Sequence, residues 1–327
     1  MPRTLALASL AATTIAWAIP ASAQTPEPGC QAQSAALAPR CQQSADFLTL
    51  MMPQLGAALA GGAPVAGEGG NLGGWGRLSF ALRGTGFRLR LPDLAAASPP
   101  PAGEPAGVPT LRQFGGIPSV EAAVGLWSGI PLEISNVGGV DFIAAYSFMP
   151  TISTSSARLV PPGGSGRFGY GVRVGVLQES YGVPGVAVSY MRRALSSTEY
   201  LATNGAGDTL AVRRARLDAD SWRLVAAKHF IALGLVAGIG QDFYTAEGVV
   251  DPSAGNGAER LATPVPVERT MTRFSGFVSA TVNFSIVRFV GEVGAALGGD
   301  AATATQFGSY APDDPVIYGS LGVRVGF

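Results

Sequence analysis

Alternation of apolar with small or polar residues, with a period of two, runs through most of the chain. The segment 167–177 is the clearest case, and its glycines and Arg173 alternate with an apolar set. That set consists of Phe168, Tyr170, Val172, Val174 and Val176. The last segment, 315–327, repeats the pattern and ends at Phe327. About ten residues with one apolar face and one small or polar face are typical of a strand in a membrane β-barrel.

The gaps between these segments alternate between short and long. The gaps at 178–183, 228–229 and 284–287 are short, whereas those at 149–166, 193–216, 246–270 and 299–314 are long. Outer-membrane barrels have short periplasmic turns and long external loops, so each gap falls on its required side if the C-terminus is periplasmic. The pattern predicts an all-β fold, a transmembrane antiparallel up-and-down barrel of ten strands, with twelve as the alternative. The predicted strands are 74–91, 118–127, 138–148, 167–177, 184–192, 217–227, 230–245, 271–284, 287–298 and 315–327.

The first strand changes phase near Gly84-Thr85-Gly86. Its apolar set moves from Leu78, Phe80 and Leu82 to Phe87, Leu89 and Leu91. We expect a β-bulge at this point, because one extra residue moves the side chains to the opposite face.

The residues before the barrel divide into a leader and a short domain. A basic start, an apolar run and the ending Ala21-Ser22-Ala23 predict a signal peptide at 1–23, since the run is too short and too rich in Ala and Thr for a membrane anchor. Residues 24–73 form a Pro- and Gly-rich segment. Within it, 42–60 has helical apolar spacing interrupted by Pro53, and Ser44 is a candidate cap. The barrel domain is 74–327.

Composition supports an exported membrane protein. The chain is 47% hydrophobic and 13% charged, with 45 glycines and zero formal net charge. No segment after the leader has the roughly 20 apolar residues of a spanning helix, and a closed barrel is the alternative that satisfies its own backbone. We therefore expect location in the bacterial outer membrane, with lipids as partners and no nucleic acid.

Two cysteines, Cys30 and Cys41, lie in the short domain. In an oxidising compartment such a pair predicts a disulfide rather than a metal site. Cys30 lies well beyond the apolar core of the leader, which argues against lipidation.

The closing sequence Tyr318-Gly-Ser-Leu-Gly-Val-Arg-Val-Gly-Phe327, together with the leader and the alternating strands, resembles the bacterial outer-membrane β-barrel proteins as a broad class. The resemblance implies that Phe327 is the signal read by the barrel-assembly machinery, a further partner. A fainter likeness connects the helical, Gly-rich stretch 47–74 to the plug of long-chain fatty acid transporters. The Asn-Pro-Ala motif of that family is missing, and the strands are too few.

The strand phases assign eleven charged residues to the lumen. They are Arg77, Arg83, Glu121, Asp141, Arg173, Arg223, Asp242, Arg273, Arg288, Glu292 and Arg324. Seven are basic and four acidic, which fits either an internal ion-pair network or a constriction that favours anions. Many other inward positions are Gly, Ala or Ser and leave room, so the helical segment 42–60 is a candidate lumen plug. A helix in the periplasm or at the membrane interface is the alternative.

The chemistry for catalysis is sparse. The one histidine, His229, lies in a predicted turn, and barrel proteases and lipases generally need a histidine base. We expect no enzymatic activity, no metal site and no cofactor. The sequence predicts a narrow passive channel or transporter for small anionic or amphipathic solutes. The alternative is a structural or adhesive barrel that binds a partner through its external loops.

Overall fold

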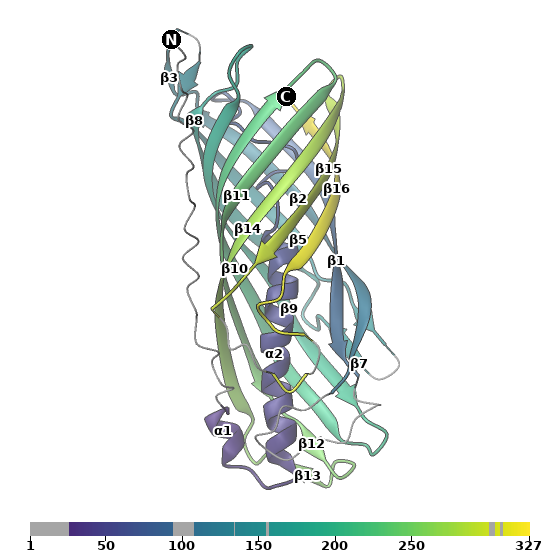
Figure 1. Ribbon diagram of the computed structural model, residues 1–327. Helices are drawn as coiled ribbons and strands as arrows, with labels where there is room; N and C mark the ends of the chain where they lie inside the picture. The colour runs from purple at the N-terminus through teal and green to yellow at the C-terminus, as the bar shows by residue number, and fades with distance from the viewer. Residues whose placement is uncertain (1–25, 94–107, 134, 155–156, 301–304, 308–309) are drawn as a thin grey trace, which may run out of the picture.

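The computed structural model describes residues 26–93, 108–133, 135–154, 157–300, 305–307 and 310–327. The predicted signal peptide lies outside the described residues. Within them, ten long strands form the wall of a cylinder (Figure 1). They are β1 (Leu78–Pro92), β2 (Thr110–Trp127), β5 (Gly139–Phe148), β8 (Gly166–Leu177), β9 (Gly185–Thr203), β10 (Thr209–His229), β11 (Leu233–Val250), β14 (Val265–Phe284), β15 (Val287–Leu297) and β16 (Val316–Gly326).

The sheet closes on itself. Each long strand pairs antiparallel with its neighbour in the chain, and β16 pairs with β1 from Ser79↔Gly326 to Phe87↔Tyr318. The fold class and the count of ten are therefore confirmed, and the twelve-strand alternative is wrong. Short two-stranded elements decorate the connections. They are β3 (Ile130–Pro131) with β4 (Asn136–Val137), β6 (Ile152–Ser153) with β7 (Ala157–Val160), and β12 (Ser253–Ala254) with β13 (Glu259–Arg260).

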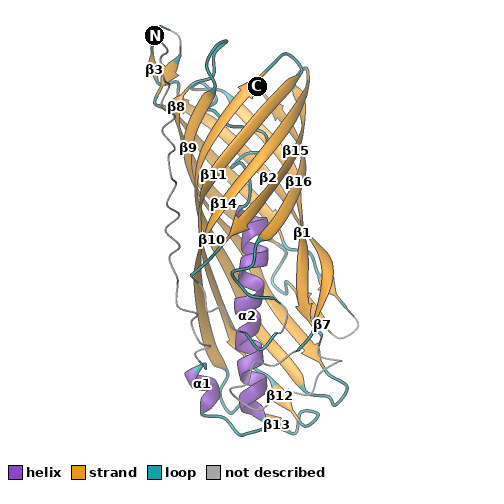
Figure 2. Ribbon diagram, viewed as in Figure 1, coloured by secondary structure: helices purple, strands orange, loops and turns teal. Residues whose placement is uncertain are grey.

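The outer surface of the wall is apolar. On β8, Val172, Val174 and Val176 are exposed, whereas Arg173 between them is 2% exposed and faces the lumen. The chain is thus a β-barrel of the outer-membrane type, with a lipid-compatible outside and a polar inside. The end with the C-terminus has the tight turn between β14 and β15 and is taken as periplasmic; the opposite end is external (Figure 2).

The β-bulge expected at Gly84-Thr85-Gly86 is wrong. Strand β1 pairs with β2 and with β16 without a register shift. Leu82 points outward, whereas Phe87 and Leu89 are buried in the lumen on the other face. The apolar residues change face because the external half of the lumen is itself apolar, not because the strand slips.

Several predicted boundaries were too short at the external end. The predicted loop 193–216 is mostly a hairpin of β9 and β10, with its tip at 204–208. Strands β2, β11 and β14 also extend further than expected. The outward positions of the β9 and β10 extensions are mostly polar, among them Glu199, Thr203 and Arg213, so they lack the apolar outer face by which strand ends were judged.

Two helices precede the barrel, α1 (Pro28–Gln31) and α2 (Leu37–Ala60). Helix α2 begins five residues before the expected start and runs through Pro53 without a break. Ser44 is no cap, since it lies inside the helix and its hydroxyl donates to the Arg40 carbonyl. Among the described residues, no helix combines the length and apolarity needed to cross a membrane.

Candidate functional site

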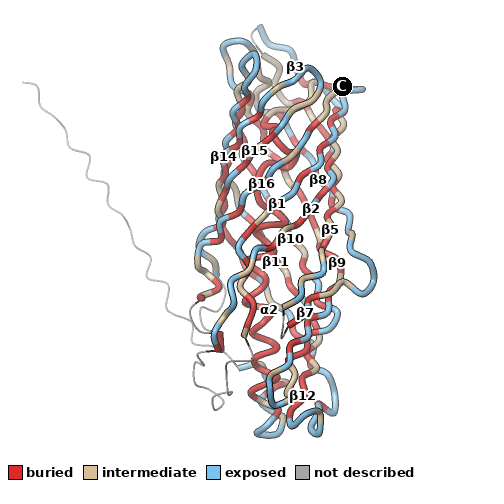
Figure 3. The backbone as a smooth tube through the Cα atoms, turned by 90° about the vertical axis from the view of Figure 1, so that its right-hand side faces the viewer, coloured by how far each residue is buried: buried red, intermediate tan, exposed pale blue. Residues whose placement is uncertain are grey.

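Helix α2 lies inside the external half of the barrel, with its N-terminal end toward the external rim and its C-terminal end near the middle (Figures 1 and 3). All of its residues except Ala38 are buried, and it contacts β10, β11, β1, β16 and β14. The chain then continues through 61–77 to the periplasmic rim, where β1 begins. The N-terminal segment therefore occupies the lumen along its length.

Apolar packing fills the lumen around α2. The ring of Phe47 stacks on Tyr200 with centroids 3.6 Å apart, and Leu50 and Met52 are at most 1% exposed. Gly56 packs directly on the ring of Tyr244. A cavity of about 30 Å³ between α2 and the wall is the size of about one water molecule, so the helix leaves little free space there.

On the periplasmic side of the helix, six buried charged side chains from six strands face the same part of the lumen. This charged ring consists of Arg83, Glu121, Arg193, Arg223, Asp242 and Glu292. Arg83 lies 3.1 Å from Glu121 and 3.7 Å from Glu292 between guanidinium nitrogen and carboxylate oxygen. Arg193 lies 3.5 Å from Glu121, and Arg223 lies 2.6 Å from Asp242. Because each charge has an opposite partner, the cost of burying it is offset.

The charged ring also holds the backbone of the lumen segment. Arg223 donates to the carbonyl of Ala60, the last residue of α2, at 2.9 Å, where a cation complements the helix C-terminus. Arg83 donates to the Ala63 carbonyl at 2.7 Å, and Glu292 accepts from the Ala63 N–H at 3.0 Å.

Further contacts of the same kind follow along the segment. Arg193 donates to the Pro64 carbonyl at 2.9 Å, and Glu121 accepts from the Ala66 N–H at 2.9 Å. The Tyr318 hydroxyl accepts from the Gly62 N–H at 2.8 Å. Gly62 has φ +82°, and a Cβ there would overlap the Glu292 carboxylate, so this approach requires glycine.

A second charged cluster lies closer to the periplasmic end. Arg173 contacts Glu68 at 3.0 Å and Asp141 at 2.8 Å, and Arg324 lies 3.5 Å from Glu68. Asp141 also accepts a hydrogen bond from the Leu72 N–H at 3.0 Å. Glu68 belongs to the lumen segment itself, so an ion pair as well as backbone contacts connects this segment to the wall.

The predicted lumen residues fall into three groups. Eight are buried within the charged ring or the second cluster: Arg83, Glu121, Asp141, Arg173, Arg223, Asp242, Glu292 and Arg324. Arg273 is buried but lies apart, donating to backbone carbonyls, among them Asp314 at 2.7 Å. Arg77 is exposed and Arg288 half-buried, and both line a pocket at the periplasmic rim.

Two functional residues were missed in the sequence. Arg193 was assigned to a loop, although it continues the inward series Ser189 and Met191 on β9. Glu68 lies in an irregular Gly-rich tract, where no periodicity indicates which way a side chain points. Extending the alternation past residue 192 would have found the first; no local signal identifies the second.

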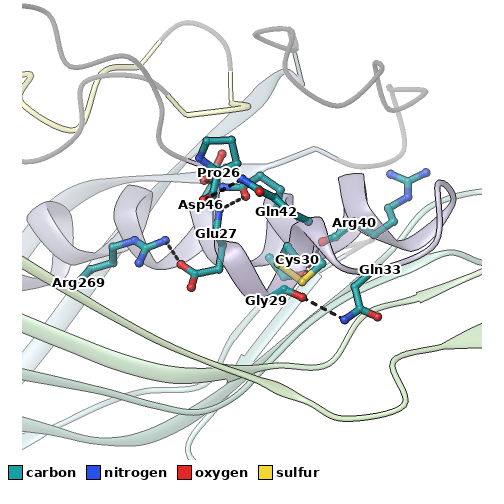
Figure 4. Close-up of a disulfide and its surroundings, with 12 residues drawn as sticks. Pro26, Glu27, Gly29, Cys30, Gln33, Arg40, Gln42, Asp46 and Arg269 are labelled. Carbon is teal, nitrogen blue, oxygen red and sulfur yellow. Dashed lines mark hydrogen bonds and ion pairs between the residues drawn. A yellow bond between two sulfur atoms is a disulfide. The ribbon is translucent and has the colours of Figure 1, made fainter.

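The external end of the lumen segment is tied down separately. Cys30 and Cys41 form a disulfide that joins α1 to α2 (Figure 4). Glu27 pairs with Arg269 at 2.9 Å, and Arg40 pairs with Asp208 at 2.6 Å. Burial raises the pKa of Asp208, but the Gly255 N–H, the Asn204 side chain and Arg40 outweigh it and hold that pKa below its ordinary value.

His229 lies at the end of β10 and has a carboxylate partner that the sequence did not suggest. Its Nδ1 is 2.6 Å from an oxygen of Glu179. No nucleophilic side chain is hydrogen-bonded to the pair among the described residues. The described part of the chain also contains no group of three or more His, Cys, Asp or Glu placed to hold a metal ion.

Comparison with known proteins gives distant barrel likenesses. No family model and no curated protein matches the sequence. The translocator domain of the autotransporter NalP from Neisseria meningitidis is similar at TM-score 0.40 and 13% identity, over 78% of this chain and 89% of that one. A TodX mutant, a monoaromatic hydrocarbon channel, is similar at TM-score 0.32 and 11% identity, over 83% of this chain and 74% of that one. An anion-selective porin from Comamonas acidovorans is similar at TM-score 0.20 and 12% identity, over 77% of this chain and 99% of that one.

Proposed function

We propose that the protein is a gated channel of the bacterial outer membrane, closed by its own N-terminal segment. The observation that carries the proposal is the charged ring, which binds residues 60–66 through hydrogen bonds to their backbone. A purely structural barrel of this width fills its lumen with wall side chains. Here the filling is a separate stretch of chain that has only one covalent junction with the wall, at β1.

The solute follows from the two linings that the segment covers. The external half is apolar and the periplasmic half is rich in arginine, so a small anionic or amphipathic solute fits the path. With residues 24–73 removed, the described lumen retains six buried arginines against four carboxylates. They are Arg83, Arg173, Arg193, Arg223, Arg273 and Arg324 against Glu121, Asp141, Asp242 and Glu292. A pore lined in this way favours anions.

Single-channel recording in a planar bilayer tests the proposal. The full chain should be closed or open only in brief events, whereas the variant without residues 24–73 should conduct steadily, with a reversal potential that indicates anion preference. A matched control is Cys30→Ser with Cys41→Ser, which removes the external tie but keeps the plug. A truncated barrel that folds but conducts no ions would contradict the channel.

The alternative is a structural or adhesive barrel. It is favoured by the long hairpins of β9–β10 and β11–β14, which extend to the external end of the barrel, where the disulfide-tied α1 also lies (Figure 1). Such a barrel would not conduct after truncation, and cell binding would depend on these hairpins. Catalysis is not part of either proposal.

Assembly is proposed to use the C-terminal residue. Phe327 is 61% exposed at the periplasmic end, while its backbone N–H donates to the Leu78 carbonyl and its carbonyl accepts from the Leu78 N–H. A terminal aromatic in this position is open to the assembly machinery before the barrel closes. Replacing Phe327 with Ser should lower the amount of folded barrel in the outer membrane, measured by its heat-modifiable mobility on gels.

A further inference from the structure

A pocket of about 280 Å³ lies at the periplasmic rim of the barrel, between the lumen segment and the wall. Three arginines from three parts of the chain line it: Arg77 before β1, Arg288 on β15 and Arg324 on β16. Three glycines, Gly69, Gly70 and Gly326, also line it.

The central arginine of this pocket is buried and has unused donors. Arg324 is 1% exposed, and one of its terminal nitrogens donates to the Ala66 carbonyl at 3.2 Å. Its Nε and its other terminal nitrogen have no hydrogen-bond partner among the described residues. A buried guanidinium with two free N–H-bearing nitrogens is costly unless a further acceptor reaches it.

The charges around Arg324 do not supply that acceptor. Its nearest carboxylate, Glu68, is 3.5 Å away and is shared with Arg173. Arg288 lies directly opposite Arg324 across the β15–β16 pair, an arrangement of like charges that destabilises a sheet. Neither Arg288 nor Arg77 has an ion pair within the described chain.

The other ionisable groups of the pocket are already engaged. The Glu179 carboxylate accepts a hydrogen bond from the backbone N–H of His229 and another from its Nδ1. The Lys228 ammonium lies 4.0 Å from the same carboxylate. The Lys228 ammonium is itself directed to the carbonyls of Ser180 and Tyr181. The pocket is therefore lined by three arginines and two side-chain carboxylates, Glu68 and Glu179, and both carboxylates already have partners.

We propose that this pocket binds the anionic group, a carboxylate or a phosphate, of a ligand that arrives from the periplasmic side. Planar guanidinium groups donate paired hydrogen bonds to both kinds of anion. The bound group pairs with Arg288 and Arg77 at the entrance, and the buried guanidinium of Arg324 behind them provides further positive charge. The site goes beyond the gating proposal, because it is formed in the closed protein and does not require conduction.

Phosphate chemistry has two sources at this depth, free anions of the periplasm and the headgroups of inner-leaflet phospholipid. The experiment separates them by using inorganic phosphate in one arm and dioleoylphosphatidylglycerol in the other. Full-length protein, folded in a neutral detergent and stripped of lipid, is titrated with phosphate by calorimetry. It is titrated with the lipid by native mass spectrometry.

The variants are Arg288→Gln and Arg77→Gln, which lie at the entrance and leave the charged ring intact. Each should weaken binding of the true ligand by about tenfold or more, since a charge-assisted hydrogen bond or contact is lost. Arg88→Gln is the matched control, because Arg88 is an exposed arginine near the external end of β1. It should bind as the parent does.

The outcomes discriminate clearly. Weakening confined to phosphate identifies a free anion, and weakening confined to the lipid identifies a headgroup; both support the site. Equal binding by the parent, both entrance variants and the control in both arms would overturn it. Since calorimetry and mass spectrometry are done on the closed protein, this result is independent of whether the truncated barrel conducts.

Discussion

The external and periplasmic halves of the lumen hold the N-terminal segment, residues 26–77, by different kinds of interaction. In the external half, apolar side chains of α2 such as Leu50 and Met52 belong to one buried cluster with wall residues such as Leu89 and Leu195. In the periplasmic half, the backbone of residues 61–73 is held by arginines and carboxylates of the wall, while Ala63 and Val65 pack in two small apolar clusters. The boundary falls at Ala60, where the helix ends and Arg223 binds its last carbonyl.

The difference is explained by where the backbone finds its hydrogen bonds. A helix satisfies nearly all of its own N–H and carbonyl groups, so an apolar surrounding is favourable. The irregular stretch 61–73 satisfies few of its own, and a buried backbone group without a partner is costly. The wall supplies the missing donors and acceptors as charged side chains, which then pair with one another.

Of the changes that separate the two halves, breaking the charged ring should lower the free energy of unfolding most. Arg83→Met leaves Glu121 and Glu292 without their main cation, and removing one partner of a buried pair costs about 3–5 kcal/mol. Urea unfolding of the detergent-folded barrel measures the loss. Arg88→Met, on the exposed outer face of the same strand, should change the free energy of unfolding by less than about 0.5 kcal/mol. Equal losses in the two variants would contradict a structural role for the ring.

A cavity in the helix half should have a somewhat smaller and more local effect. Leu50→Ala removes a fully buried side chain of α2 and should cost about 3 kcal/mol. Because Leu50 packs in the apolar cluster around α2, the loss should appear as faster hydrogen exchange in α2, with the β8 amides unchanged. Uniformly faster exchange across the barrel would show that the two halves do not respond separately.

Gln54 joins α2 to the wall at the point where β1 stops pairing with β16. Beyond Phe87, β1 no longer pairs with β16, and the Gln54 side chain accepts from the Arg90 N–H at 2.7 Å and donates to the Arg90 carbonyl at 3.5 Å. Gln54→Ala should destabilise by about 1–2 kcal/mol. The measurement is exchange of the Arg90 amide, with Gln113→Ala on β2 as control. An unchanged Arg90 amide would exclude the tie.

Acid should loosen the external end by the smallest amount. The pKa of Asp208 is lower in the folded protein than in the unfolded chain, so its contribution is complete above the unfolded value of about 3.9. That contribution is lost as pH falls through the lower folded value. Protease cleavage near α1 should therefore increase only below about pH 4. The Asp208→Asn variant should be cleaved faster than the parent at neutral pH. A rise near pH 6 would point to another group.

The sequence predicted the wall well and its contents poorly. Alternation is a local signal, so β8 and β16 were placed within one residue, and the inward side of Arg173 and Arg324 followed from it. The external ends of β9 and β10 were missed because those strands pack on α2, which the alternation in the wall does not reveal. The contacts of Glu68 depend on how an irregular tract folds inside the lumen, which no periodic pattern encodes.

The central claim is that residues 26–77 pass through the lumen from the external rim to the periplasmic rim. A short epitope inserted after the exposed Ala35 tests it, with the same epitope after Tyr181, a fully exposed residue of a periplasmic turn, as control. In intact cells, antibody should bind the first protein and not the second; after permeabilisation it should bind both. An Ala35 epitope that stays hidden until the outer membrane is opened, in a barrel that folds normally, would contradict the account.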